Sequence, residues 1–121
     1  MENLYLKWKD YKTGKAYVIG ALMRDKENNK YYFKLDSASV DIAKENGFNS
    51  AFIPFEIDKI YESDTIFDFF KIRLPRIDKL DEEDVAEMLE ELQMKEYDEF
   101  EYFRKTKGEL MTDDFILEEE K

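Results

Sequence analysis

Apolar and polar side chains alternate through the first third of the chain, and this alternation predicts β-strands. Leu4, Leu6 and Trp8 are separated by more polar residues, and a period of two is typical of a strand with one buried face. Residues 17–23 and 31–35 are also rich in apolar and aromatic side chains, and short polar links with glycine or asparagine separate the three segments. We therefore expect three strands joined as an antiparallel meander.

The next segment changes to a helical pattern. Ser37 or Ser39 can cap a short helix that runs to about Asn46, and Gly47 follows where a left-handed residue commonly ends a helix. Residues 48–55 then read as an extended segment.

A phenylalanine-rich segment follows and predicts a second helix. It begins at Ser63 or Asp64 and ends near Leu74, because Pro75 disfavours helical backbone in the residue before it. The apolar side chains cover about 220° of the helix surface, whereas a helix with one buried face needs little more than about 100°. Two interpretations stay open: a central helix that is packed on two sides, or a helix on which Phe69 or Ile72 helps to form a groove for a partner.

Two further helices are predicted in the last third of the chain. Asp81 can cap a helix from Glu82 to about Met94, whose apolar residues recur at helical spacing. Acidic residues occupy the opposite face of this helix: Glu83, Asp84, Glu87, Glu90 and Glu91. A shorter helix is predicted over residues 97–105, then a strand over 115–117.

These elements predict an α+β fold in a single domain of residues 1–121. We expect a small, mostly antiparallel sheet packed by the Phe-rich helix in residues 1–80. Two acidic amphipathic helices follow within residues 81–117, and residues 118–121 are expected to be a frayed tail.

Charge is distributed unevenly along this 121-residue chain. Its net charge is −11, and counting along the sequence gives +4 for residues 1–35, −3 for 36–80 and −12 for 81–121. Such asymmetry favours basic partners and disfavours direct nucleic-acid binding, because phosphate backbones bind basic surfaces. The acidic face of the helix at 82–94 is either a solvated side or a recognition surface for a basic partner.

Histidine and cysteine are both absent from the sequence. This excludes nucleophile systems that use them and the common zinc sites. We expect no enzymatic activity, no cofactor and no metal. The lack of cysteine also favours a cytoplasmic location. Because the sequence has no long apolar run, we expect no signal peptide and no membrane-spanning segment.

Two clusters of acidic residues could still support acid–base or metal-dependent catalysis. Residues 81–84 are acidic, but they lie at a predicted helix start, where capping explains them. Glu56, Asp58 and Lys59 resemble a nuclease centre only superficially, because the spacing differs from the usual Glu-x-Lys.

Lysines alternate with aromatic residues near the N-terminus. Lys7, Lys9, Lys12 and Lys15 surround Trp8 and its neighbours. This pattern suits either a weak site for single-stranded nucleic acid or a solvated strand whose lysines protect a sheet edge. We expect Trp8 to lie in the core, since it follows the apolar alternation.

Some of these segments resemble known families. Residues 18–22, 31–35 and 67–75 resemble the N-terminal subdomain of HipA-type kinase toxins, although Arg76 replaces the glutamate that family has after the proline. In some toxin–antitoxin operons this subdomain is a separate protein that inhibits the kinase.

A second resemblance covers nearly the whole chain. Residues 60–74, 104–108 and 112–115 resemble the N-terminal region of bacterial proteins that carry a HIRAN domain further on. DNA binding is a property of that later domain, so it is not implied here. Both resemblances imply a non-catalytic α+β module.

We therefore expect a regulatory, antitoxin-like module that binds and occludes a larger protein, such as a kinase-type toxin or a nucleic-acid-binding protein. The predicted partner-binding residues are Phe69, Ile72 and the five acidic residues of the helix at 82–94. Two alternatives are an acidic, phage-type inhibitor that occupies a nucleic-acid site and a weak single-strand binder that uses the lysine-rich N-terminal strand.

Overall fold

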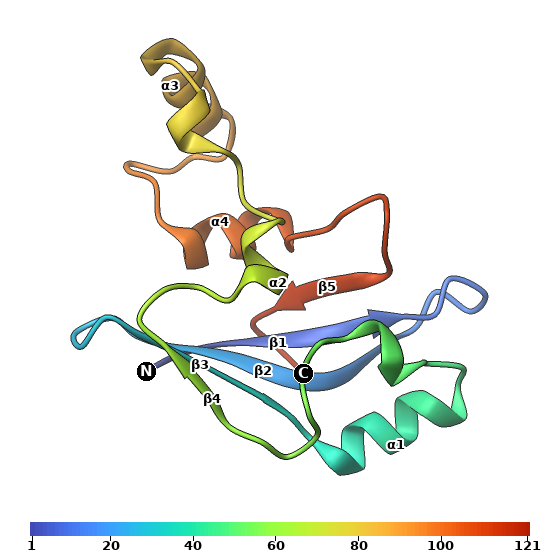
Figure 1. Cartoon of the computed structure of the whole chain (residues 1–121). Helices are drawn as coiled ribbons and strands as arrows, with labels where there is room; N and C mark the ends of the chain where they lie inside the picture. Colours follow the sequence, from blue (N-terminus) through green and yellow to red (C-terminus); the bar gives the residue numbers. More distant parts are fainter.

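The computed structural model describes all 121 residues and has an α+β fold, as the sequence predicts (Figure 1). Five strands form one antiparallel sheet in the order β4-β3-β2-β1-β5. Their bounds are β1 Glu2–Lys9, β2 Ala16–Asp25, β3 Lys30–Leu35, β4 Tyr61–Ser63 and β5 Phe115–Glu118. The first three strands and the last one confirm the pattern of the sequence. Each of the four helices is too short and too polar to span a membrane.

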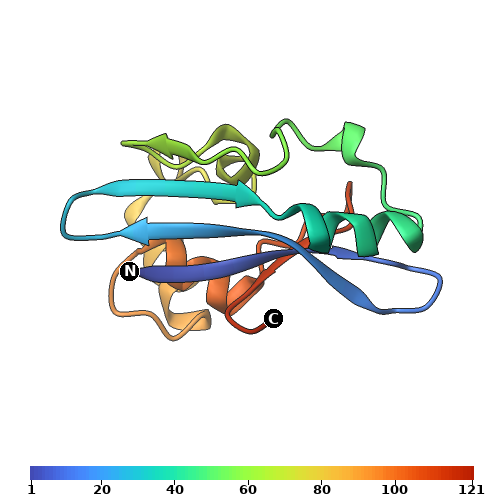
Figure 2. The ribbon, with the colours of Figure 1, turned by 90° about the horizontal axis from the view of Figure 1, so that it is seen from below.

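The helices are short and lie around the sheet rather than in one layer (Figures 1 and 2). Their bounds are α1 Ser37–Glu45, α2 Asp68–Lys71, α3 Glu82–Glu91 and α4 Glu99–Thr106, with 3₁₀ turns at Ser50–Phe52 and Ile77–Lys79. Helix α1 follows β3 directly and packs beside β2, whereas α4 packs against β5.

The core joins inward-facing strand residues to aromatic side chains from the rest of the chain. Leu4, Leu22 and Phe33 are completely buried on the strands, and Phe70 and Phe100 are completely buried on α2 and α4. Phenylalanine supplies much of this core because each ring buries a large apolar area.

One glycine permits the strands to pair closely. Gly20 lies on β2 opposite Leu6 and Leu35, and a Cβ atom at this position would lie 2.5 Å from the carbonyl oxygen of Lys34. No side chain fits at that distance without displacing the backbone of β3.

The Phe-rich helix is much shorter than predicted. Residues 61–63 pair with β3 instead, and Phe67 has extended backbone (φ −65°, ψ 145°), so α2 spans only Asp68–Lys71. The turns on either side of α2 point the aromatic side chains in several directions. A single longer helix could not have placed them all in the core.

Smaller corrections concern the ends of elements. Asp36, rather than either predicted serine, caps α1 and accepts a hydrogen bond from the Ser39 amide at 2.9 Å. Gly47 does take positive φ (+106°), as predicted. The segment expected to be extended at 48–55 contains a 3₁₀ turn, and α3 ends at Glu91 rather than near Met94.

Candidate protein-interaction surface

Helix α3 begins with the cap that the sequence predicts. The Asp81 carboxylate accepts a hydrogen bond of 2.8 Å from the amide of Asp84, and three acidic residues occupy the first turn. Negative charge is favourable there because the N-terminus of a helix carries partial positive charge. The acidic residues of the first turn therefore stabilise the start of this helix.

Helix α3 stands away from the sheet (Figure 1). None of its residues is fully buried, and its apolar stripe, which includes Val85, Met88 and Leu89, is only half-buried. The nearest firm anchor is Met94, which is buried just after the helix. Little packing therefore constrains the surroundings of the acidic face.

The acidic side chains of α3 form an exposed group without ion pairs. Every predicted acidic residue on it is exposed, and none takes part in an ion pair: Glu83, Asp84, Glu87, Glu90 and Glu91. Their repulsion is thus not relieved within the chain, which leaves a concentrated negative surface.

Several carboxylates outside α3 are paired with cations, most completely around Arg24. This buried guanidinium donates two hydrogen bonds to Asp98, at 2.8 and 3.0 Å, and one of 2.7 Å to Glu2. Burial alone would raise the pKa of Asp98, but the Arg24 hydrogen bonds and the Glu101 amide outweigh it and hold that pKa below its ordinary value. The hydrogen bond from Arg24 likewise lowers the pKa of Glu2.

Arg73 is a second buried cation. Its guanidinium donates to the carbonyl oxygens of Gly108 (2.9 Å) and Phe115 (3.3 Å) and pairs with Asp113. It also lies 5.0 Å from the centre of the Phe69 ring. Arg73 thereby ties α2 to the start of β5.

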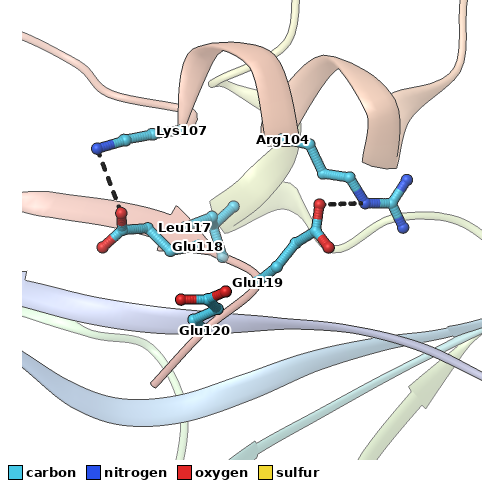
Figure 3. A pocket seen from close by; sticks show the side chains of 6 residues that line it. All are labelled: Arg104, Lys107, Leu117, Glu118, Glu119 and Glu120. Carbon is cyan, nitrogen blue, oxygen red and sulfur yellow. Dashed lines mark ion pairs between the residues drawn. The ribbon is translucent and has the colours of Figure 1, made fainter.

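The C-terminal segment is held by charge rather than frayed (Figure 3). Glu118, predicted to begin the tail, belongs to β5 and pairs with Lys7 at 3.0 Å and Lys107 at 3.2 Å. These cations lower the pKa of Glu118, and Arg104 pairs with Glu119 at 3.2 Å. Of the charged side chains around this hollow of about 320 Å³, Arg104, Lys107, Glu118 and Glu119 are paired, and Glu120 forms no ion pair.

The two predicted apolar contact residues lie in different surroundings. Phe69 is half-buried and packs edge-on against Phe55, Phe70 and Phe115, with ring centres 5.1 to 5.9 Å apart. Ile72 is 66% exposed and is surrounded by charged side chains of α2 and the turn after it. The structure therefore does not bring these two residues into one apolar patch.

The lysine-rich strand is largely engaged within the fold. Lys7 is buried against Glu118, and Lys9 pairs with Glu109 at 3.6 Å. Trp8 is half-buried and stacks on Tyr17 at 6.0 Å between ring centres. Only the lysines of the turn after β1 remain without an ion pair.

The other carboxylates of interest have local structural partners. Glu56 pairs with Lys59 at 3.3 Å, and Asp58 accepts a hydrogen bond from the amide of Ser37. No group of three or more carboxylates converges in a geometry that could hold a metal ion.

The sequence did not predict an aromatic groove that lies at the end of the sheet where β1 turns into β2. Tyr11, Phe48, Phe52 and Asp114 line it together with Trp8. These residues come from segments far apart in the sequence, so no local spacing could group them. The one local signal was the presence of large aromatic side chains in turns.

Comparison with protein-family models, with curated proteins and with solved structures finds no match to this chain. The resemblances to HipA-type toxins and to HIRAN-domain proteins thus stay predictions, and function has to be inferred from the surfaces described above.

Proposed function

We propose that this chain is a non-catalytic regulatory module that binds a larger, basic protein through the acidic face of α3. The observation that carries the proposal is the contrast in pairing: the five acidic residues on the exposed face of α3 form no ion pair, whereas Glu2, Asp98 and Glu118 are each held by arginine or lysine. A charged surface left without internal partners is suited to an external one. The lack of cysteine is in keeping with action in the cytoplasm.

The acidic face would act mainly on the rate of association. Each exposed ion pair contributes only about 0–1 kcal/mol, so five of them do not hold a complex on their own. The combined electrostatic field of these five carboxylates accelerates the encounter with a basic partner. Salt weakens this effect, because the screening length falls to about 8 Å at physiological ionic strength. Occlusion of the partner's own site by the bound module is the regulatory step.

Charge-neutral variants test this proposal once a partner has been identified by cross-linking in the native host. The first variant carries Glu83→Gln, Glu87→Gln, Glu90→Gln and Glu91→Gln. The control neutralises four exposed acids outside α3 that also lack ion pairs, with the substitutions E27Q, D41N, E45Q and E62Q.

We expect the α3 variant to associate at least about tenfold more slowly at low salt, with a flatter salt dependence, and the control to change by less than about twofold. Association rates measured by stopped flow decide between them. Equal slowing of both variants would show that net charge matters and that α3 does not.

A second candidate function uses the same face. The net charge of −12 over residues 81–121 also suits an inhibitor that occupies the nucleic-acid site of its target. In that case DNA or RNA competes with this chain for the partner. If the partner is instead a kinase-type toxin, binding reduces kinase activity and nucleic acid has no effect on it.

A further inference from the structure

The aromatic groove lies at the β1–β2 turn, at the opposite end of the sheet from α3 (Figures 1 and 2). It has a volume of about 460 Å³. The segments around it are the end of β1, the β1–β2 turn, the chain from Gly47 to the 3₁₀ turn, α2 and the start of β5. Their principal side chains are Trp8, Tyr11, Phe48, Phe52, Phe69 and Phe115.

Part of this aromatic surface is left uncovered. Tyr11 and Phe52 are each 76% exposed, although burial of such rings is favourable. Gly47 lies beside Trp8, where a Cβ atom would be 3.8 Å from the indole, so residue 47 contributes no side chain over the ring. Exposed aromatic residues that gather at a groove are typical of a binding surface.

The charge of the groove selects the kind of side chain that fits it. No lysine or arginine lines it, and its two charged residues are Asp113 and Asp114. Arg73 pairs with Asp113, but Asp114 is exposed and forms no ion pair. The faces of aromatic rings carry partial negative charge, because of the ring quadrupole, and therefore attract cations. An uncompensated carboxylate beside several rings therefore favours a cation with an apolar stem.

We infer that this groove receives an arginine or lysine side chain from a basic segment of a partner protein. The stem packs against Trp8 and Phe52, the cationic group lies over the exposed rings, and the Asp114 carboxylate supplies the counter-charge. This inference deepens the proposed function and rests on it for the identity of the partner as a basic protein. It adds a contact that holds the complex, whereas α3 accelerates its formation.

A short peptide tests the groove without the partner. The probe is Ac-Gly-Ala-Arg-Ala-Gly-NH₂, and its control has citrulline, an uncharged isostere, in place of arginine. Trp8 is the only tryptophan of the chain, so its fluorescence and its indole N–H resonance report on the groove directly. The same titrations are run on Asp114→Asn, on Tyr11→Ala/Phe52→Ala and on the charge-neutral α3 variant.

We expect millimolar or tighter binding of the arginine peptide, with resonance shifts at Trp8, Asn49 and Asp114. Binding becomes at least about fivefold weaker with the citrulline peptide and with Asp114→Asn, and at least about fivefold weaker without the two exposed rings, since each cation–π contact contributes about 0.5–1 kcal/mol. Tyr11 and Phe52 project into solvent, so removing them leaves the fold intact.

Three results would overturn the inference: no shift at Trp8 up to about 5 mM peptide, equal binding of the arginine and citrulline peptides, or burial of Trp8 by self-association without peptide. The charge-neutral α3 variant separates this inference from the proposed function. If that variant binds the peptide normally but associates with the partner at the unchanged rate, the groove stands and the role of α3 fails. The converse pair of results leaves α3 and removes the groove.

Discussion

Replacing Asp98 should destabilise the fold far more than replacing a similar helix cap on α3. Asp98 performs two tasks: its side chain accepts a hydrogen bond of 3.0 Å from the Glu101 amide at the start of α4, and it pairs with the buried Arg24. Asp81 performs only the first of these tasks, at the start of α3. Asp98→Ala and Asp81→Ala therefore form a matched pair.

The magnitude follows from these contacts. Loss of a helix cap costs about 1 kcal/mol, and loss of a charge-assisted hydrogen bond about 1.5–3 kcal/mol. Arg24 keeps Glu2, so the cost stays below the value for a fully orphaned buried charge, which is about 3–5 kcal/mol. We expect about 3 kcal/mol for Asp98→Ala, about 2 kcal/mol for Asp98→Asn and no more than about 1 kcal/mol for Asp81→Ala.

Thermal and urea unfolding measure these differences. With an unfolding entropy of about 2.1 cal/mol/K per residue, 3 kcal/mol lowers the Tm of a chain of this length by about 12 °C. Equal destabilisation by Asp98→Ala and Asp81→Ala would refute the reasoning, because it would mean that the Arg24 pair contributes nothing beyond capping.

The pH dependence supplies an independent check. A carboxylate whose pKa is lowered on folding stabilises the native state above its unfolded pKa, near 3.9, and this stabilisation is lost as pH falls. The pKa of Asp98 is lowered in the fold. The difference in stability between wild type and Asp98→Asn should therefore be largest near neutral pH and narrow below about pH 4.

Three further predictions concern other buried positions. Gly20→Ala should cost about 2 kcal/mol or more in urea unfolding, because its Cβ atom would collide with the β3 backbone. Gly14→Ala is the control: nothing lies within 4 Å of that Cβ and only the positive φ (+75°) opposes it, so about 1 kcal/mol is expected. Arg73→Leu should cost about 3 kcal/mol, since it leaves Asp113 and two carbonyl oxygens without their donor. Burial and a hydrogen bond to Glu99 raise the pKa of Tyr31 to about 12, so ultraviolet titration should show a late phenolate that Tyr31→Phe removes.

Each of these has a result that would contradict it. Gly20→Ala as mild as Gly14→Ala would mean that β3 yields easily. A stable Arg73→Leu protein would show that the charged cluster is dispensable, as apolar replacements of buried ion pairs sometimes are. Between pH 10 and 12 wild type should also lose stability with rising pH, because the unfolded state then gives up the Tyr31 proton more readily.

The strands were predictable because their signal is local. The alternation around Leu4 and Leu6 and the aromatic run at 31–35 correspond to β1 and β3, with the polar links between them as turns. The cap at Asp81 was predictable for the same reason, since a carboxylate three residues before the amide it accepts from is a short-range pattern.

The Phe-rich segment was mispredicted because the contacts that determine its conformation come from residues distant in the sequence. Residues 61–63 have a free strand edge to pair with, which the sequence around them does not reveal. Phe67 to Phe70 are then placed by contacts with Phe55 and Phe33. Tertiary packing outweighs helical propensity when aromatic side chains face in several directions.

The candidate surfaces divide in the same way. The acidic face of α3 follows from helical spacing, so its members were identified from the sequence. The groove joins Tyr11 to Phe52 and Asp114, and the pairing of β5 with β1 brings Asp114 beside the end of β1. Long-range strand pairing of this kind has no signature within a short sequence window.

The position of β5 beside β1 also determines the order in which the strands can pair during translation. Leu6 pairs with Leu117, so one edge of β1 has no partner until the ribosome has released more than a hundred further residues. The β1–β2–β3 meander can form early during translation, but the fifth strand joins the sheet only after residues 115–118 have been synthesised. Chaperones that shield exposed strand edges would therefore meet the nascent chain along β1.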